Sequence, residues 1–335
     1  MNVIVTGACG FIGHHLVEHL IRKTTWNIII IDKLNYASFG LDRIKDAGLI
    51  NHPRVKIITW DLCTPFTPGI KHELGEVNMI IHMAAETHVD NSISDPVPFI
   101  KNNIDSTVNL LEYARTCKNL KNFIYFSTDE VFGNAPKGHS YKEWDSHHPT
   151  NPYSASKSAS EMICLSYENT YKIPLMILNF MNAFGERQHC EKFIPKVIKS
   201  ILENKNIDIH TYPDGETPGS RFYIHARNIA SAVLFIIKNG KSGEKYNVIG
   251  EKEVNNLEMA QMIAKIMGGN PLNYNLVDFH TDRPGHDVRY ALDGSKLISM
   301  GWKVPVSFED SLRQTVEWTL RNKRWLNDIN DINDM

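Results

Sequence analysis

The sequence has no long hydrophobic run. A helix that crosses a bilayer needs roughly 20 consecutive apolar residues, whereas the longest apolar run near the start of the chain is Ile28–Ile31. The N-terminus also lacks a basic region followed by an apolar stretch and a cleavage site. We therefore expect neither membrane association nor a signal peptide.

Cysteines are few and scattered. The five thiols are odd in number, far apart, and include no C-x-x-C pair. A disulfide framework and a zinc cage are therefore both poor predictions. We expect a reducing, cytoplasmic compartment and no metal site. The residues are Cys9, Cys63, Cys117, Cys164 and Cys190.

The chain also lacks an excess of charge of either sign. Lys plus Arg number 36 and Asp plus Glu 38, which gives a formal net charge of -2. A nucleic-acid partner is not expected, because nucleic-acid polymers select strongly basic surfaces. Apolar residues make up 42% of the 335 and charged residues 22%, which is ordinary globular usage rather than disorder. A chain of this length forms about two domains.

The first half alternates short apolar strands with amphipathic helices. Strands that are apolar throughout are typical of parallel sheets covered on both faces. The pattern therefore predicts an α/β fold with a doubly wound parallel sheet of the Rossmann type. Strands are expected at Asn2–Thr6, Asn27–Asp32, Val55–Asp61, Asn78–Met83, Phe123–Ser127 and Leu175–Asn179, and helices at Phe11–Arg22, Phe99–Cys117 and Asn151–Tyr171.

The pattern changes after about residue 180. Stretches rich in proline and glycine, such as Tyr212–Gly215 and Arg283–Gly285, separate the later helices. We expect a smaller, loop-rich α/β substrate lobe over the carboxyl edge of the sheet. The predicted division is a first domain over 1–180, whose later strands return from about 220–250, an interleaved lobe over 181–325, and a polar tail over 326–335.

A glycine-rich turn stands between the first strand and the first helix. Its spacing, G-x-x-G-x-x-G over Gly7, Gly10 and Gly13, is one residue off the usual dinucleotide fingerprint. Glycines let the backbone approach a pyrophosphate, and the helix N-terminus supplies N–H donors. Asp32 follows Gly13 by 19 residues, where a carboxylate can accept hydrogen bonds from the adenosine ribose. Because a carboxylate repels a 2′-phosphate, we predict NAD over NADP, a preference that Lys33 weakens slightly.

Tyr153 and Lys157 lie four residues apart on a predicted helix and so share one face. A tyrosine with a pKa of about 10 is a poor base, but a neighbouring ammonium lowers that pKa. The phenolate can then take a proton from a substrate alcohol while a nicotinamide accepts hydride. Alone, this spacing is usually a solvated helix face; together with the dinucleotide turn it indicates a dehydrogenase-type site.

These motifs together resemble the extended short-chain dehydrogenase/reductases, a family of nucleotide-sugar epimerases, dehydratases and decarboxylases. Ser127–Gly133 is similar to the Thr-Asp-Glu-Val-Tyr-Gly motif of nucleoside-diphosphate-glucose 4,6-dehydratases. The 4-epimerases have small hydroxyl residues where Asp129 and Glu130 stand. The resemblance covers roughly residues 1–322, with further matches at 32–37, 84–92, 151–157, 191–195 and 282–290.

The resemblance implies NAD-dependent dehydration of dTDP-glucose or UDP-glucose to the 4-keto-6-deoxy-glucose nucleotide, as in rhamnose-type deoxysugar synthesis. In that reaction Tyr153, assisted by Lys157 and Thr128, deprotonates the 4-hydroxyl while NAD⁺ takes the C4 hydride. Glu130 then removes the C5 proton and Asp129 protonates the leaving C6 hydroxyl. The hydride returns to C6 and a proton to C5, so the cofactor is regenerated.

The resemblance also implies the binding residues and a partner. An anionic pyrophosphate needs Arg or Lys, although the arginines alone are as readily surface residues and Asp61 as readily a turn carboxylate. Family members pair through two helices, here Phe99–Cys117 and Asn151–Tyr171, so we expect a homodimer. Cofactor contacts are expected from Gly7, Gly10, Phe11, Ile12, Gly13, Asp32, Asp61, Leu62, Ala84, Tyr153 and Lys157, and substrate contacts from His88, Asn182, Lys192, Arg221, Asn256, His286 and Arg289.

Four residues depart from the family pattern. Phe132, Ala183, Phe184 and Glu186 stand where Tyr, Asn, Tyr and Pro are usual, and they leave the nucleotide and sugar contacts open. The segments 87–92 and 101–104 look closer to plant-type UDP-glucose dehydratases, which favours UDP over dTDP.

Two other kinds of function remain. Among enzymes, the alternative is a nucleotide-sugar 4-epimerase or a UDP-glucuronate decarboxylase. The identity of the product distinguishes these from a dehydratase, because only the dehydratase forms a 4-keto-6-deoxy sugar. Outside enzymes, the fold could serve as an NAD-sensing module without turnover. A pure binder has no need of Thr128, Tyr153 and Lys157 together, which favours an enzyme.

Overall fold

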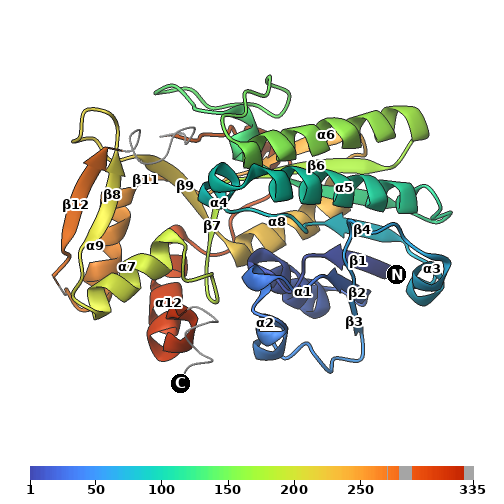
Figure 1. The fold of residues 1–335 in the computed structure, drawn as a ribbon, viewed down its shortest axis with the longest axis horizontal. Helices are drawn as coiled ribbons and strands as arrows, with labels where there is room; N and C mark the ends of the chain where they lie inside the picture. The colour runs from blue at the N-terminus through green and yellow to red at the C-terminus, as the bar shows by residue number, and fades with distance from the viewer. Residues whose placement is uncertain (270, 279–288, 328–335) are drawn as a thin grey trace.

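The computed structural model describes residues 1–269, 271–278 and 289–327. Its main sheet has seven strands in the order β10-β6-β5-β4-β1-β2-β3, all parallel (Figure 1). The order of the strands reverses between β1 and β4, which is where open α/β sheets bind ligands at their carboxyl edge. The strands are β1 (Asn2–Thr6), β2 (Asn27–Asp32), β3 (Val55–Thr59), β4 (Met79–His82), β5 (Asn122–Thr128), β6 (Leu175–Phe180) and β10 (Glu244–Val248).

Helices cover both faces of this sheet. One face carries α1 (Phe11–Lys23) and α8 (Ala226–Asn239), and the other carries α3 (Pro68–Leu74), α5 (Pro96–Ala114) and α6 (Pro152–Tyr171). Alternate side chains of one strand serve the two cores: Val3 and Val5 pack toward α1, whereas Ile4 packs toward α5. This two-sided burial explains why the strands are apolar at every position, and it confirms the predicted Rossmann-type fold.

The predicted element ends differ from the observed ones by a few residues. The helix expected from Phe99 begins at Pro96, because proline is well suited to the first turn of a helix. The third strand ends at Thr59, so that Asp61 lies in the following loop rather than closing the strand. These shifts leave the layer order unchanged.

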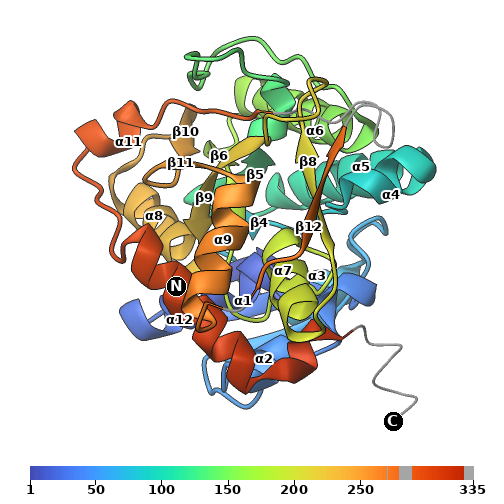
Figure 2. The same ribbon diagram turned by 90° about the vertical axis from the view of Figure 1, so that its left-hand side faces the viewer.

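The second half of the chain builds a smaller lobe beside the sheet (Figure 1), and Figure 2 views the molecule from the side of this lobe. β10 returns from this part of the chain to the edge of the main sheet, so the two parts are interleaved. The domain boundaries near 180 and 325 stay a prediction, and most of the predicted tail lies outside the described residues. The lobe contains a sheet of β7 (Asn182–Phe184), β9 (Ser220–His225) and β11 (Glu253–Asn255), the pair β8 (Ile207–Thr211) and β12 (Tyr274–Asp278), and the helices α7 (Phe193–Leu202), α9 (Asn256–Ile266) and α12 (Phe308–Arg321).

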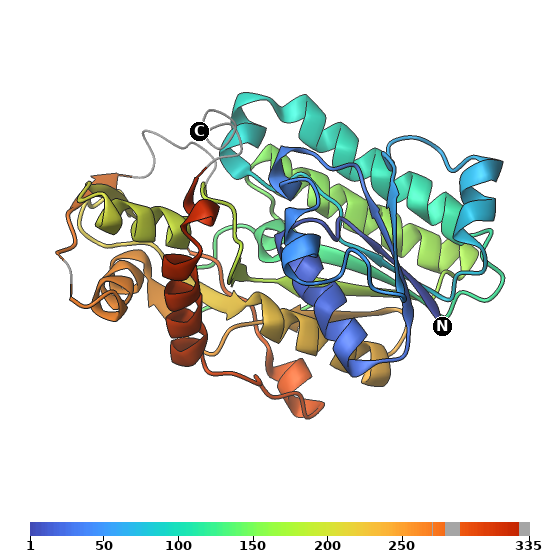
Figure 3. The ribbon, with the colours of Figure 1, turned by 90° about the horizontal axis from the view of Figure 1, so that it is seen from below.

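Short helical segments complete the described chain. They are η1 (Tyr36–Ser38), α2 (Asp42–Asp46), α4 (Val89–Ser94), η2 (Asp129–Phe132), α11 (Ser295–Ser299) and η3 (Lys323–Leu326). Figure 3 shows α12 between the lobe and the sheet domain. From η3, which follows α12, Arg324 pairs with Asp46 at 2.5 Å, and the indole Nε1 of Trp325 donates to the same carboxylate at 3.3 Å. The last described segment is therefore fastened to the first domain.

Across residues 1–269, 271–278 and 289–327, no helix combines the length and the apolar character needed to cross a bilayer.

Buried histidines make the stability of the fold depend on pH. Burial lowers the pKa of both His15 and His82 to about 3, whereas an unfolded histidine titrates at about 6.5. Below pH 6.5 the unfolded chain therefore takes up protons that the folded chain does not. The free energy of unfolding should be highest above about pH 6.5 and should fall toward pH 3 by roughly 1.4 kcal/mol per pH unit for each histidine.

Urea unfolding at pH 5.5, 6.5 and 7.5 measures this slope. His15→Gln removes one of the two titrating groups, so the dependence of the unfolding free energy on pH should become smaller by the contribution of one histidine. Equal stability at pH 5.5 and 7.5 in the unsubstituted protein would contradict the prediction.

Candidate active site

A cleft of about 880 Å³ opens at the carboxyl ends of the central strands. Its walls are the glycine-rich turn, the loops that follow β2, β3, β4 and β5, the start of α6, and parts of the lobe around β7, α7 and β9. A cleft of this size, at the switch point of the sheet and bordered by a second lobe, is the expected place for a cofactor and a substrate.

The glycine-rich turn is packed too closely for side chains. Gly7 has a φ of +67°, and a Cβ there would lie 2.7 Å from the Cα of Ala84. A Cβ on Gly13 would lie 2.5 Å from the Cα of Ala8. The close packing leaves the start of α1 bordering the cleft, with Phe11 and Ile12 in its lining. Backbone N–H groups at this helix end suit a pyrophosphate.

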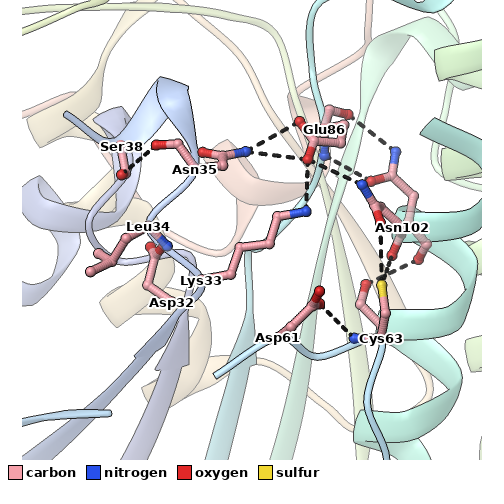
Figure 4. Close-up of polar contacts among 11 residues, drawn as sticks. Asp32, Lys33, Leu34, Asn35, Ser38, Asp61, Cys63, Glu86 and Asn102 are labelled. Carbon is pink, nitrogen blue, oxygen red and sulfur yellow. Dashed lines mark hydrogen bonds and ion pairs between the residues drawn. The ribbon is translucent and has the colours of Figure 1, made fainter. Parts of the chain in front are cut away.

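Asp32 holds the turn at the end of β2. Its Oδ2 accepts a hydrogen bond from the backbone N of Cys9 and its Oδ1 one from Leu34 N, both at 2.9 Å. Burial is the main cause of the raised pKa of Asp32. Each oxygen keeps acceptor capacity, so the carboxylate fits the ribose role predicted for it. Asp61 and Leu62 line the same end of the cleft, where the Oδ1 of Asp61 accepts from Cys63 N at 2.9 Å (Figure 4).

Thr128 organises the two carboxyl groups that follow β5. Its hydroxyl donates to Asp129 Oδ1 at 3.0 Å and accepts from the backbone N of Glu130 at 3.3 Å. Tyr290 OH and Asn151 Nδ2 donate to Glu130 Oε2 at 3.3 and 3.5 Å. These two donors hold the Glu130 carboxylate in position.

Asp129 is in a different environment. Burial, followed by the charge of Glu130, raises the pKa of Asp129 to about 8. Its Oδ2 is buried and has no hydrogen-bond partner among the described residues. Asp129 therefore holds a proton at neutral pH, so the two adjacent carboxyl groups are suited to acid and base roles.

Tyr153 and Lys157 lie on α6, which begins with a capping box formed by Asn151 and Ser154. Lys157 Nζ donates to the backbone oxygen of Phe126 at 2.6 Å. Burial lowers the pKa of Lys157 to about 8. Burial, followed by the charge of Glu130, raises the pKa of Tyr153, and a hydrogen bond with Thr128 opposes the rise.

The expectation that Lys157 lowers the pKa of Tyr153 is therefore wrong, because burial and the charge of Glu130 raise that pKa. The ammonium is directed at a carbonyl oxygen, and its charge is not among the influences on the phenol.

The predicted substrate residues fall into two groups. His88, Asn182, Lys192, Arg221 and Asn256 line the cleft. The Arg221 guanidinium lies over the ring of Tyr290 at 4.7 Å, and Lys192 immediately precedes α7 rather than lying within a helix. These side chains bring a lysine and an arginine to the lobe side of the cleft.

Arg289 is placed elsewhere. It pairs with Glu253 at 2.7 Å and donates to the backbone oxygens of Pro136 and His139 at 2.9 and 2.8 Å. It is not among the residues lining the cleft, so its substrate contact stays a prediction, and the contacts observed join it to Glu253 and to the 136–139 loop. His286 lies outside the described residues.

The four departures from the family pattern mostly fill the interior. Phe132 stacks on Tyr141, and Phe184 packs in the core of the lobe. Glu186 pairs with His225 at 3.0 Å, which contributes to a lowered pKa of about 2 for this carboxyl. Ala183 borders the cleft. Phe184 also borders the cleft, so Ala183 and Phe184 are the two departures placed to affect ligand contacts directly.

Several contacts within the cleft are absent from the sequence-based prediction. Glu86 pairs with Lys33 at 3.0 Å, Arg43 donates to Ala37 O at 2.7 Å, and Tyr290 contacts Glu130. Each contact joins residues that are far apart in the chain or that lie in a loop, so no local sequence pattern predicts it. Within the described ranges, no group of three or more His, Cys, Asp or Glu side chains is placed to hold a metal ion.

Comparison with known proteins adds to this geometry. The sequence profile of the GDP-mannose 4,6 dehydratase family matches residues 4–315. A dTDP-glucose 4,6-dehydratase of Haemophilus influenzae is 36% identical and covers 96% of this chain and 98% of its own length. A trifunctional UDP-glucose 4,6-dehydratase of Arabidopsis thaliana is 33% identical over 98% of this chain and 48% of its own length.

Solved structures agree. A dTDP-glucose 4,6-dehydratase from Streptomyces venezuelae with NAD bound has a TM-score of 0.87 and 32% identity, covering 97% of this chain and 98% of its own. The UDP-glucuronic acid 4-epimerase of Bacillus cereus, in complex with UDP-glucuronic acid and NAD, has a TM-score of 0.85 and 26% identity, covering 96% and 100%. Because one fold carries both reactions, the residues of the cleft have to distinguish them.

Proposed function

The chain belongs to the GDP-mannose 4,6 dehydratase family, and from this premise we propose that it is an NAD-dependent lyase that dehydrates dTDP-glucose or UDP-glucose to the 4-keto-6-deoxy-glucose nucleotide. The observation that carries the proposal is the pair Asp129 and Glu130, adjacent in sequence but in unlike environments, beside Tyr153 in a cleft continuous with the dinucleotide turn. An epimerase has no need of such a pair.

The cofactor site fits NAD. The Gly7–Gly13 turn and Asp32 would hold the pyrophosphate and the adenosine ribose. The oxidised nicotinamide, when bound, supplies a hydride acceptor for sugar C4 and a positive charge. That charge would favour the phenolate of Tyr153, which burial disfavours.

The protein groups then divide the proton transfers. Tyr153, held by Thr128, takes the proton of the 4-hydroxyl. The C5 proton, acidified by the adjacent ketone, goes to Glu130, whose carboxylate is positioned by Tyr290 and Asn151. Asp129, still protonated at neutral pH, gives its proton to the departing C6 hydroxyl.

Parallel incubation with dTDP-glucose and UDP-glucose tests the proposal. Mass spectrometry should find a nucleotide sugar that has lost one water. Unchanged mass with inversion at C4 would indicate an epimerase, loss of carbon dioxide from UDP-glucuronate would indicate a decarboxylase, and NAD binding without any conversion would indicate a sensing module.

Both nucleotide sugars have to be tested because the contacts of Asn103, in one of the two segments that favour UDP, do not identify the base. Asn103, from segment 101–104, accepts from the backbone N of Glu86 at 2.8 Å and donates to Ser156 Oγ at 2.8 Å. These contacts position the loop after β4 against α6 and do not themselves read a base.

The pKa of Asp129 predicts the alkaline limb of the reaction. An acid that must be protonated supports turnover below its pKa and loses it above. We expect kcat to be level near pH 7 and to fall above about pH 8, approaching tenfold per pH unit. The amide of Asp129→Asn can donate a hydrogen bond but does not titrate. This variant should therefore keep a low activity that does not fall above pH 8. If kcat of Asp129→Asn still falls above pH 8, the titrating group would be Lys157 instead, whose pKa is also about 8.

We also propose a homodimer in the cytoplasm. No disulfide joins cysteines of the described chain, which suits a reducing compartment. α5 and α6 lie side by side on the outside of the molecule (Figure 1). They expose Val97, Ile100 and Met162, with exposed fractions of 67%, 44% and 46%, and apolar side chains in such positions are typical of an interface.

Met162→Lys should weaken this dimer. A buried charge without a partner at the interface is costly, so the dissociation constant should rise at least tenfold, or about 1.4 kcal/mol. Light scattering after size exclusion measures the effect. Leu202→Lys, a matched change of an exposed apolar residue on α7, should leave the dimer intact. A dimer equally stable in both variants would place the interface elsewhere.

A further inference from the structure

A salt bridge crosses the cofactor side of the cleft. Lys33 Nζ lies 3.0 Å from Glu86 Oε1, and both residues line the cleft. Lys33 follows β2 and Glu86 follows β4, and β1 lies between these strands in the sheet. The bridge therefore passes in front of the end of β1, where the dinucleotide turn begins. Figure 4 shows the Lys33 side chain reaching from beside Asp32 across to Glu86.

Glu86 is fixed from several directions. Asn35 Nδ2 donates to its two carboxylate oxygens at 3.2 and 3.3 Å, and Asn102 Nδ2 donates to Oε1 at 3.2 Å (Figure 4). Its backbone N and O both bond to the buried amide of Asn103, at 2.8 and 3.1 Å. The carboxylate has an exposed fraction of only 13%. Glu86 is therefore a preset anchor for the lysine.

The charges around Asp32 show why such an anchor matters. Two cations flank this carboxylate: Lys33 next in sequence, and Arg43, whose charge acts on Asp32. Arg43 is fully buried, donates to Ala37 O and Arg187 O at 2.7 and 2.9 Å, and so is held in place. Lys33, one-third exposed, is the cation able to turn toward the adenosine ribose. A cation there attracts a 2′-phosphate, which would offset the repulsion by Asp32.

We propose that Glu86 determines the choice of cofactor by holding the ammonium of Lys33 away from the adenosine 2′ position, so that Asp32 can select NAD over NADP. Glu86 acts through Lys33 and is a positioning residue rather than a catalytic one. The inference rests on the proposed NAD-binding function but concerns a different quantity, the ratio of the two dinucleotide affinities.

Glu86→Gln tests the proposal because it keeps the size of the side chain and one acceptor for Asn102 while removing the charge that holds Lys33. Dissociation constants for NAD⁺ and NADP⁺ would be measured by titration calorimetry on the full chain cleared of cofactor. The ratio of the NADP⁺ constant to the NAD⁺ constant should fall at least tenfold. Lys33→Gln combined with Glu86→Gln should restore the ratio to its original value, because no cation is then released.

Two controls keep the outcome clear. Lys33→Gln alone should leave the ratio within threefold, since the ammonium is already withheld. Glu73→Gln, which breaks the exposed ion pair with Lys56, should also leave it unchanged. The proposal would be overturned by an unchanged ratio in Glu86→Gln or by a tenfold shift of the ratio in Lys33→Gln alone. It would also be overturned if the ratio in the double variant stayed as low as in Glu86→Gln. If the unsubstituted chain bound neither dinucleotide, the proposed function itself would fail.

Discussion

Tyr153→Phe should lower kcat by roughly 10³-fold, within the range that a positioned proton-transfer group contributes. The phenol lies beside Thr128 and the two carboxyl groups, where it is placed to take the proton of the 4-hydroxyl. Since the hydroxyl adds little packing volume, the dissociation constants of NAD⁺ and of the nucleotide sugar should change by less than threefold. Single-turnover mixing should yield no NADH signal.

Thr128→Val is the matched control. It removes the hydrogen bonds to Tyr153 and Asp129 without removing a proton-transfer group, so we expect a loss of about tenfold. Turnover of Tyr153→Phe within tenfold of the unsubstituted enzyme would contradict the assigned role.

Glu130→Gln should stop the reaction at a later point. Oxidation at C4 does not need this carboxylate, whereas removal of the C5 proton does, so NADH should accumulate upon mixing with the correct nucleotide sugar. Dehydrated product should fall by roughly 10³-fold. Rapid-mixing absorbance follows the NADH, and mass spectrometry of quenched samples follows the loss of water.

The contrast between the two variants separates the roles. Tyr290→Phe removes the phenol hydroxyl that donates to Glu130 at 3.3 Å, and we expect it to slow elimination about tenfold while accumulating less NADH than Glu130→Gln. Product formation by Glu130→Gln at the ordinary rate, or absence of NADH in it, would place the base at another residue.

The family indicated by the motifs is confirmed by relatives that match nearly the whole chain. The catalytic candidates could be found from sequence because each set is local: Thr128–Glu130 are contiguous, and Tyr153 and Lys157 are one turn apart. Backbone geometry alone brings such residues together. The periodic apolar pattern likewise predicted the layers of the sheet.

The remaining contacts could not be predicted because they depend on tertiary placement. Glu86 meets Lys33 only when the loops after β2 and β4 are side by side, and Arg289 is occupied by Glu253 from another strand. The pKa of Tyr153 followed burial rather than its neighbour in sequence. Burial and competing partners are properties of the fold that residue spacing does not report.

The late return of β10 has a consequence for synthesis of the protein. Until residues 244–248 have left the ribosome, β6 is an uncovered edge with unpaired backbone groups. The sheet face beneath α8 is equally bare before residue 226. A nascent chain of 180 residues thus contains the dinucleotide turn and the Tyr-Lys helix but not a finished sheet, and the exposed edge of β6 is a site for aggregation until β10 has emerged and paired with it.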